Sequence, residues 1–289
     1  MNSVTPLSGK ASRISPANAL AGLGLLAIAA VSAHATPLTN GGFETGDFTG
    51  WTVSGFTGQT LPLDDSQHTT ANFLSNESAG TPTTPTNSVV TSQTTAFDGF
   101  GPASSPPVLP TAGNHLAFIS NETHAGEPNS DGSVIAGSAI RTTFTVAVGA
   151  TALTFDTRFL SNEEIDGGFD FGGVALLVGK TLLAEFIMDN DPGTPTSVAN
   201  AHTQAVAAGG FNDSTDWLKE SFNLTGLDGQ TLTLLAFATH TFDQFTESRT
   251  LLDNVAQVAP NSVPEPTTFA LLGLGLLGVP HFGRKFRRS

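Results

Sequence analysis

The chain of 289 residues contains no cysteine and no tyrosine. The absence of cysteine excludes disulfide bonds, a thiol nucleophile and any metal site built on thiolates, so burial of apolar side chains must stabilise the fold. Only two tryptophans are present, Trp51 and Trp217. The sequence therefore offers few of the amphipathic aromatic side chains on which proteins stack sugar rings.

Basic residues are also scarce between the two ends of the chain. Six of the 11 Lys and Arg residues and one of the 25 Asp and Glu residues lie in the terminal segments, residues 1–35 and 260–289. The body of the chain, residues 36–259, therefore holds five basic and 24 acidic residues, a formal charge of −19. Nucleic-acid affinity depends on Lys and Arg that neutralise phosphates, so the composition excludes nucleic acid as a partner. An acidic surface is compatible with divalent cations, with neutral polysaccharides or simply with solubility.

Long amphipathic helical segments are missing from the body, whereas Gly, Pro, Thr and Phe are abundant. Several segments alternate apolar and polar residues, as 141–148 and 231–237 do, and this period of two is typical of half-buried strands. Turn-forming pairs separate them at 149–150, 179–180 and 228–229. The predicted strands are 115–120, 139–148, 152–160, 171–178, 181–188, 217–224, 231–239 and 250–258.

Two loop regions complete this prediction. Residues 81–110 are rich in Pro, Thr and Ser and read as a long surface excursion, and residues 189–210 read as a second loop with one short helix at 197–208. The predicted fold is all-β, an antiparallel β-sandwich of jelly-roll type, with a signal-peptide helix at the N-terminus and a short hydrophobic helix at the C-terminus.

The C-terminal residues combine three features in a fixed order. Pro264 and Pro266 flank Glu265 and hold the backbone extended, the shape that a protease or transpeptidase cleft prefers. The uncharged run 269–279 follows, and it is shorter than the roughly 20 residues that cross a bilayer unaided. A basic cluster comes last, formed by Arg284, Lys285, Arg287 and Arg288. Such clusters stay on the cytoplasmic side of a membrane, which places the body outside.

This order of features resembles the PEP-CTERM sorting signal, over residues 260–289. The resemblance implies a Gram-negative bacterium that makes exopolysaccharide, and an exosortase in its inner membrane that recognises the Pro-Glu-Pro step. It further implies export of the body to the cell surface or extracellular matrix, with transient or retained anchoring at the inner membrane. Residues 280–282, which separate the apolar run from the basic cluster, depart from the simplest form of the signal. The alternative is an ordinary tail-anchored protein.

The N-terminal residues have the pattern of a secretory signal peptide, which makes signal peptidase an expected partner. Lys10 and Arg13 precede the apolar stretch 19–31, and Ala-His-Ala at 33–35 is a small-x-small cleavage pattern. A retained N-terminal membrane helix is the alternative. The predicted organisation is a signal peptide, a β-sandwich domain and a sorting signal, at residues 1–35, 36–259 and 260–289.

Two motifs of the body carry a second resemblance. Residues 40–51, Asn-Gly-Gly-Phe-Glu-Thr-Gly-Asp-Phe-Thr-Gly-Trp, and residues 251–255, Leu-Leu-Asp-Asn-Val, are similar to the opening and closing motifs of galactose-binding-like jelly rolls, which include many carbohydrate-binding modules. The resemblance implies that the first and last strands lie side by side and that Glu44 and Asp253 help to hold a structural Ca²⁺, a cation that takes six to eight oxygen ligands. The alternative is that Glu44 caps a turn and Asp253 accepts hydrogen bonds from backbone amides. Trp51 is expected in the core.

Three segments share the order Phe, aliphatic, Ser, Asn, Glu, at 73–77, 118–122 and 159–163. Each reads as a strand end that enters an acidic loop, where Ser and Asn bond to the local backbone and start a turn. A sharper interpretation gathers these loops at one end of the sandwich as an acidic rim for a second cation or a sugar. The carboxylates of that rim are Glu77, Glu122, Glu163, Glu164, Asp166 and Asp170.

The sequence contains no clear catalytic constellation. Glu163 and Glu164 are the acids that a glycosidase would need, but neighbours in a loop point apart. The histidines are dispersed without a His-Glu-x-x-His motif, and a Gly-x-Ser-x-Gly elbow is absent. We therefore predict no enzymatic activity, no catalytic residue and no cofactor apart from calcium.

Three functions remain, and all of them are compatible with the same location at the cell surface or in the extracellular matrix. The leading one is a structural or adhesive protein of the cell surface or matrix. The others are a secreted carbohydrate-binding module and a matrix polysaccharide hydrolase, and exopolysaccharide is the expected partner of both.

Overall fold

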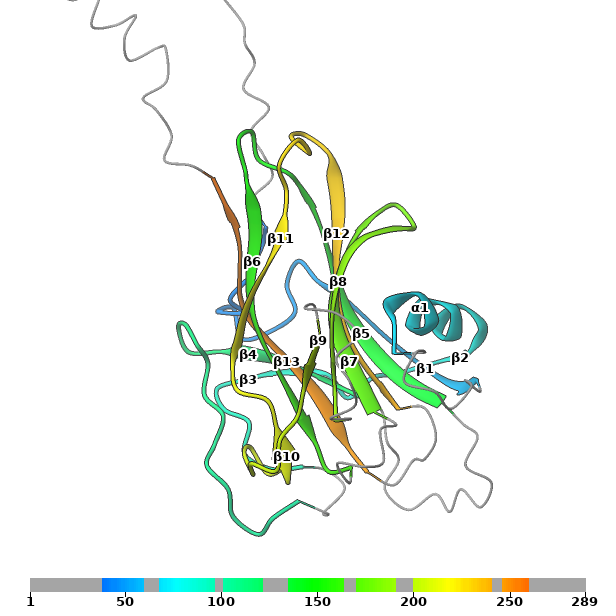
Figure 1. Cartoon of the computed structure of the whole chain (residues 1–289), viewed down its shortest axis with the longest axis vertical. Coiled ribbons are helices and arrows are strands. Elements are labelled where there is room, and N and C mark those ends of the chain that lie inside the picture. Colours follow the sequence, from blue (N-terminus) through cyan, green and yellow to red (C-terminus); the bar gives the residue numbers. More distant parts are fainter. Residues whose placement is uncertain are drawn as a thin grey trace, which may run out of the picture. The chain divides into compact units, whose positions relative to one another are not determined.

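The computed structural model describes residues 38–59, 68–96, 101–121, 135–163, 170–190, 200–240 and 246–259, all of them in the unit Ala35–Ser289. The described residues form two β-sheets that face each other and one α-helix on the outer face of the larger sheet (Figure 1). All strand pairs are antiparallel except β8 with β9. The predicted antiparallel β-sandwich is confirmed.

The larger sheet has seven strands in the order β2-β1-β5-β12-β7-β8-β9. Its central strands β5, β12 and β7 are long, whereas the strands at its two edges, β2 and β9, have three residues each. In that order the bounds are Thr81–Thr83, Thr52–Gln59, Ile135–Thr145, Thr231–His240, Asp170–Val178, Thr181–Asp189 and Asn200–His202.

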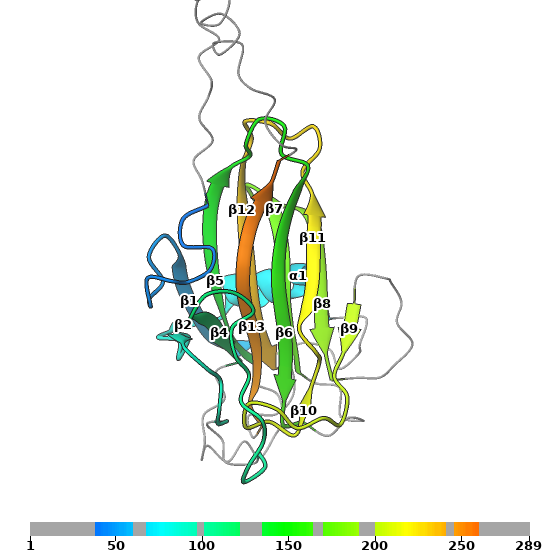
Figure 2. The same cartoon turned by 90° about the vertical axis from the view of Figure 1, so that its left-hand side faces the viewer.

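The smaller sheet follows the order β10-β6-β13-β4-β3, with β11 paired to β6 beside β10 (Figure 2). From β4 to β7 consecutive strands alternate between the two sheets, and so do β11, β12 and β13, whereas β7 and β8 are neighbours in the larger sheet. The bounds are Asp213–Ser214 for β10, Ala152–Ser161 for β6, Ser248–Val258 for β13, Leu116–Ser120 for β4, Ser88–Val90 for β3 and Leu218–Asn223 for β11.

Strand β12 is buried on both faces, and this explains the arrangement of the core. Leu232 and Leu234 point into the cluster between the sheets, together with Phe144 of the neighbouring β5 and Phe155 and Phe159 of β6 in the opposite sheet. The alternate residues of β12 point the other way, into a second apolar cluster on the outer face of the larger sheet. Since that outer cluster would otherwise face water, the fold needs a further element to cover it.

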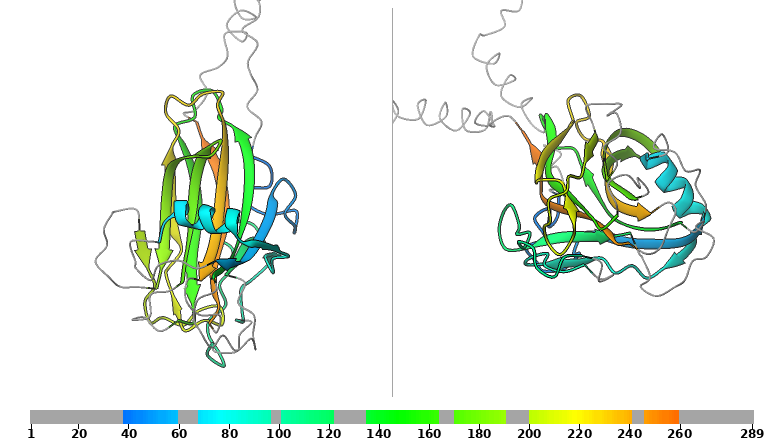
Figure 3. Two further views of the ribbon diagram at one scale, coloured as in Figure 1. Left: turned by 90° about the vertical axis from the view of Figure 1, so that its right-hand side faces the viewer. Right: turned by 60° about the horizontal axis from the view of Figure 1, so that its bottom comes forward.

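The covering element is helix α1, Thr70–Ala79, which crosses the strands of the larger sheet (Figure 3). Phe73 is 1% exposed and its ring stacks on that of Phe237 at 4.3 Å between centroids. The side chain of Thr69 caps the helix by accepting the amide hydrogen of Asn72, and Glu185 of β8 accepts the amide hydrogen of Thr70 at 2.8 Å. A carboxylate at this end suits the positive pole of the helix dipole.

The helix overturns one sequence prediction. Residues 73–77 were expected to end a strand and enter a loop, yet they lie within α1. The two other copies of the motif do end strands, since β4 ends at Ser120 and β6 at Ser161. The five-residue pattern is thus compatible with a helix and with the end of a strand. At residues 73–77 the packing of Phe73 against the sheet favours the helix.

The eight predicted strands are all confirmed, with ends that move by a few residues. Their turns are confirmed as well: Gly149, Gly179 and Gly229 have φ angles of 76°, 58° and 72°, a region that glycine enters without strain. The predictions omitted β1, α1 and four short strands.

Two loop predictions need correction. The helix expected at 197–208 is wrong for its described part, because Asn200–His202 forms β9 beside β8 and the residues after it are irregular. The excursion 81–110 contains β2 and β3, and the backbones of Gln93 and Val108 pair in an isolated bridge. Short strands of this kind carry too little alternation to be detected from sequence.

The role of α1 as a cover predicts the effect of one core substitution. We expect Phe73→Ala to lower the free energy of unfolding by about 3–5 kcal/mol, the usual cost of such a truncation in a core, with exposure of the outer apolar cluster. Denaturant unfolding measures this, and the exposed Ser78→Ala on the same helix is the control, with an expected change within about 0.5 kcal/mol. Equal stability of the two variants would contradict the cover role.

Candidate functional site

The segment 40–51 folds into a tight loop that its own side chains organise. The ring of Phe43 is fully buried and lies 5.2 Å from that of Trp51, which is also buried as expected. The indole N–H of Trp51 and the amide of Phe43 both donate to the carbonyl of Asn40. The Asn40 side chain in turn donates to the carbonyl of Asp47 at 2.8 Å. Most of the motif is thus explained by packing and loop closure.

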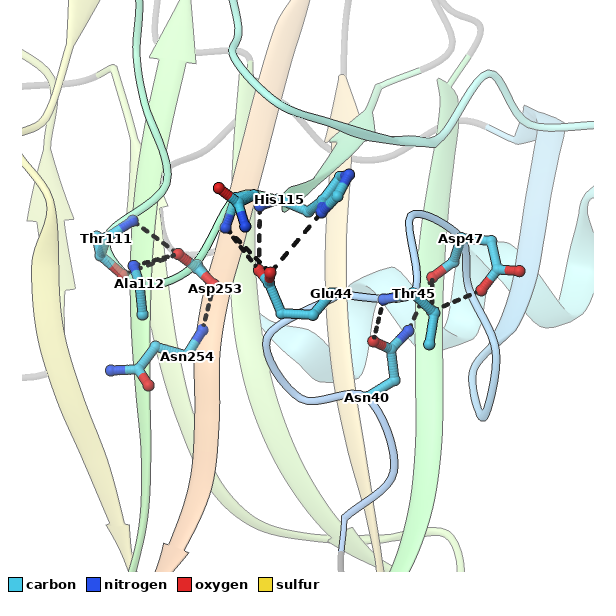
Figure 4. Close-up of polar contacts among 10 residues, drawn as sticks. Asn40, Glu44, Thr45, Asp47, Thr111, Ala112, His115, Asp253 and Asn254 are labelled. Carbon is cyan, nitrogen blue, oxygen red and sulfur yellow. Dashed lines mark hydrogen bonds and ion pairs between the residues drawn. The ribbon is translucent and has the colours of Figure 1, made fainter.

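Glu44 projects from this loop and holds a second loop that lies before β4 (Figure 4). Its carboxylate accepts the amide hydrogens of Asn114 at 2.9 Å and of His115 at 3.1 Å. The bond from the Asn114 amide is the main cause that lowers the pKa of Glu44 below its ordinary value. Gly113 has a φ angle of 64°, and a Cβ atom there would lie 2.2 Å from a Glu44 oxygen. A side chain at this position would therefore displace the Glu44 carboxylate and strain the backbone.

Asp253 holds the other end of the same loop (Figure 4). Its Oδ2 accepts hydrogen bonds from the amide and hydroxyl of Thr111, at 2.7 and 2.9 Å, and from the amide of Ala112 at 3.1 Å. Its Oδ1 accepts the amide hydrogen of Asn254. Burial raises the pKa of Asp253 above its ordinary value, and the donated hydrogen bonds oppose that rise. Glu44 and Asp253 therefore act as two clamps on residues 111–115.

The chain ends of the body meet, but in a different way from the expected pairing of first and last strands. Strand β1 pairs with β2 and β5, whereas β13 pairs with β4 and β6 in the other sheet. The segment before β1 provides the contact instead, because the amide of Val255 donates to the carbonyl of Gly41 at 2.9 Å. A Cβ on Gly41 would lie 2.1 Å from the Val255 oxygen, so only glycine fits.

Calcium at Glu44 and Asp253 stays a prediction. In the structure the carboxylate oxygens of both residues face N–H or O–H donors, an arrangement that fits a clamp on the loop and not a set of metal ligands. Within the part of the chain that the structure describes, no three His, Asp or Glu side chains gather closely enough to hold a metal ion. Asp253 accepts hydrogen bonds from backbone amides, as the alternative expected, whereas Glu44 bonds to the amides of a distant loop and not to a turn of its own.

The acidic rim stays a prediction, because the structure describes only some of its carboxylates. Glu77 lies on α1 and pairs with Arg141 of β5, while its other oxygen accepts the hydroxyl hydrogen of Ser54 at 2.7 Å. Glu163 lies at the end of β6, is 5% exposed and accepts a hydrogen bond from Thr246. Glu122, Glu164 and Asp166 lie outside the described residues. A buried, hydrogen-bonded Glu163 suits a structural role.

The two motif copies that do end strands lie on either side of β13. The amide of Asn121 donates to the carbonyl of Ser248, and the amide of Asn162 donates to that of Glu247, both at 3.1 Å. The Asn121 side chain also donates to Asp170 at 2.9 Å. These side chains are buried, and the bonds of Asn121 reach residues far along the chain, not the local backbone that the turn interpretation expected. Ser161 does make a local bond, because its hydroxyl accepts the amide hydrogen of Glu163 at 3.0 Å.

Sequence analysis missed a pairing of two histidines through one carboxylate. Asp189, at the end of β8, contacts Nδ1 of His68 at 3.3 Å and Nδ1 of His202 in β9. The His68 ring also stacks on Phe171 at 4.6 Å. Because 121 residues separate His68 from Asp189, no local pattern could reveal this contact.

The comparison with protein families identifies the C-terminal segment. Residues 262–288 match the PEP-CTERM protein-sorting motif, as predicted from the Pro-Glu-Pro step and the tail. The motif indicates export and membrane-associated sorting by an exosortase. The motif itself, the apolar run and the predicted N-terminal signal peptide lie outside the described residues. Among the residues that are described, no helix is long and apolar enough to cross a membrane. No curated protein matches the chain.

Solved structures similar to the body include carbohydrate-binding modules. The carbohydrate-binding module CBM27-1 of Caldicellulosiruptor saccharolyticus, in complex with mannohexaose, has a TM-score of 0.37 at 14% identity over 80% of this chain and all of its own. TmCBM61 with β-1,4-galactotriose has 0.35 at 11% identity, over 77% of this chain and 97% of its own. The K1 cleaved adhesin domain of Lys-gingipain from Porphyromonas gingivalis W83 has a TM-score of 0.34 at 14% identity, over 76% of this chain and 96% of its own. Scores and identities this low carry no argument about function.

The clamp predicts an acid-sensitive loop. The pKa of Glu44 is lowered in the folded protein. The stabilisation that its carboxylate gives to the loop is therefore fully present above the ordinary glutamate pKa and is lost as the pH falls through the lowered value. We expect hydrogen exchange of the Asn114 and His115 amides, corrected for intrinsic rates, to accelerate below about pH 4. In Glu44→Gln we expect weaker protection at neutral pH and no acid step. Glu220→Gln on β11 is the control, and an acid step that persists in Glu44→Gln would contradict the clamp.

Proposed function

We propose that this protein is an exported component of the cell surface or extracellular matrix, delivered by exosortase, in which the β-sandwich has a structural or adhesive role. The observation that carries the proposal is the sorting motif at residues 262–288. It follows the sandwich directly, because β13 ends at Val258 and the Pro-Glu-Pro step begins at Pro264. The segment 259–263 spans at most about 18 Å when extended, which holds the body close to the membrane until the motif is processed.

The composition of the body suits this location. Its formal charge of −19 disfavours nucleic acid and anionic lipid and keeps an exported domain soluble. Without cysteine, its stability depends on two apolar clusters and on polar clamps, and it needs no oxidising environment to fold. Exosortase and signal peptidase are the processing partners in this proposal, and exopolysaccharide is the surrounding material.

A structural calcium at Glu44 and Asp253 belongs to the proposal only as a separate prediction of the family resemblance. Calcium would have to compete with the amides of residues 111–115 for the same oxygens. Calorimetric titration of Ca²⁺ into the processed protein tests it, with Asp253→Ala as the control. Binding heat that this variant abolishes would support the metal, and an absence of heat would leave the amide clamp as the full account of both carboxylates.

Processing is tested by the intact mass of the protein from its native cell fraction, with the exosortase gene present and deleted. We expect the residues after the Pro-Glu-Pro region to be lost only when exosortase is present. Any added mass would identify attachment to lipid or glycan. Retention of 269–289 in both strains would make this a tail-anchored envelope protein and overturn the proposal.

A matched variant separates loss of recognition from loss of the enzyme. Pro264→Ala combined with Pro266→Ala removes the rigid backbone around Glu265 and leaves the apolar run and the basic tail intact. We expect this variant to keep its C-terminal segment even when exosortase is present. Processing at the wild-type level would show that the Pro-Glu-Pro step is not what the enzyme recognises.

A further inference from the structure

A groove runs along α1 on the outer face of the larger sheet. One wall is α1, the floor is formed by β5, β12 and β7, and the β7–β8 turn lies at its other side (Figures 1 and 3). Its volume is about 690 Å³, within the range of roughly 300–1,000 Å³ that small-molecule sites occupy. The groove lies where the outer face changes from the apolar cluster under Phe73 to polar residues.

The walls of the groove combine small apolar surfaces with hydrogen-bonding groups. Ala71, Leu74 and Leu177 provide the apolar part, and the hydroxyls of Ser75, Ser78 and Thr233 lie around them. An ion pair and a lysine complete the lining: Glu77, Arg141 and Lys180. None of the described residues that line it is aromatic, so a ligand is held here by polar contacts and aliphatic C–H surface.

The ion pair between Glu77 and Arg141 is held in place by Ser54, and both of its side chains remain partly exposed in the groove. Ser54 of β1 donates to Glu77 at 2.7 Å and accepts from Nη1 of Arg141 at 2.6 Å, and Nη2 of Arg141 contacts the other Glu77 oxygen. The side chains of Arg141 and Glu77 remain 23% and 20% exposed. Arginine has five N–H donors, so this guanidinium can hold Glu77 and meet a ligand at the same time.

The charge of the groove is opposite to that of the body. Two of the five basic residues of the body line it, Arg141 and Lys180, against one acid, Glu77. The lining therefore has a formal charge of +1 on a body of −19. Lys180 is exposed in the β7–β8 turn, and no ion pair of Lys180 is found among the described residues.

These groups define the chemistry of a ligand. Glu77 only accepts hydrogen bonds when ionised, so the ligand must donate O–H groups to it. Arg141 and Lys180 only donate, so the ligand must also accept, and a carboxylate does this best. The serine and threonine hydroxyls suit further hydroxyls, and the leucines suit the C–H face of a ring. A hydroxylated ring that bears a carboxylate meets all of these conditions.

We infer that the groove between α1 and the β7–β8 turn binds a uronic acid residue of a polysaccharide. The carboxylate lies between Lys180 and Arg141, the ring hydroxyls bond to Glu77 and the hydroxyls of α1, and the ring lies over Leu74 and Leu177. The site is distinct from the Glu44 and Asp253 clamps. The inference goes beyond the proposed location and does not depend on processing by exosortase.

The test is calorimetric titration of the purified protein with trimers of galacturonic, glucuronic and mannuronic acid, each against its neutral hexose trimer. We expect at least one acidic trimer to bind, and to bind more tightly than its neutral counterpart. Lys180→Glu places a repelling charge at the mouth of the groove and should weaken that binding about tenfold or more. Lys219→Glu, an exposed lysine on β11 of the other sheet, is the matched control and should leave the affinity unchanged.

A second variant tests the location independently of charge. Ser75→Trp fills the groove from the exposed side of α1 and should abolish binding, while an unchanged unfolding transition shows that the fold is intact. Amide chemical shifts should change at residues 75, 78 and 233 on titration. The inference is overturned if no acidic trimer binds, if Lys180→Glu and Lys219→Glu weaken binding equally, or if Ser75→Trp binds like the wild type.

Discussion

The double burial of strand β12 is the constraint on which the rest of this structure depends. A strand at the centre of a sandwich buries one face against the opposite sheet, but β12 also carries Leu235 and Phe237 on its outer face, within the second apolar cluster. That cluster cannot face water without a large cost. The larger sheet therefore requires an outer cover, and the 10 residues of α1 provide it with Phe73 at the centre.

The way in which α1 is fastened also creates the polar part of the outer face. Glu185 holds the start of the helix to β8, and Glu77 holds its end to β5 through Arg141. These contacts leave charged groups beside an aliphatic surface, in a groove with rigid walls on a regular sheet. Sites built on such elements are better defined than sites built on loops alone. Fold stability and the proposed ligand site thus share the same ion pair.

The two halves of the chain differ in how far the sequence predicts them. Strands after residue 114 follow from alternation and from glycine turns, because both signals are local. Helix α1 does not, because its first amide is bonded by Glu185, more than a hundred residues away, and its identity depends on the pocket that Phe73 fills. Glu44 and Asp253 could be singled out as partners at one junction, but their donors are backbone amides of residues 111–115, which have no sequence signature. The sorting motif, in contrast, is linear and can be recognised without a fold.

The short strands at the sheet borders affect how such a domain behaves when many copies lie close together. Among the described strands, the larger sheet ends in β2 and β9 with three residues each, and the smaller sheet ends in β3 with three residues on one side and in β10 and β11, with two and six residues, on the other. A long exposed edge would present unpaired N–H and C=O groups to any neighbouring strand, and copies concentrated at one surface would then pair edge to edge. Edges this short offer only a few such groups. The borders of the sheets therefore favour many separate copies over a fibrous aggregate.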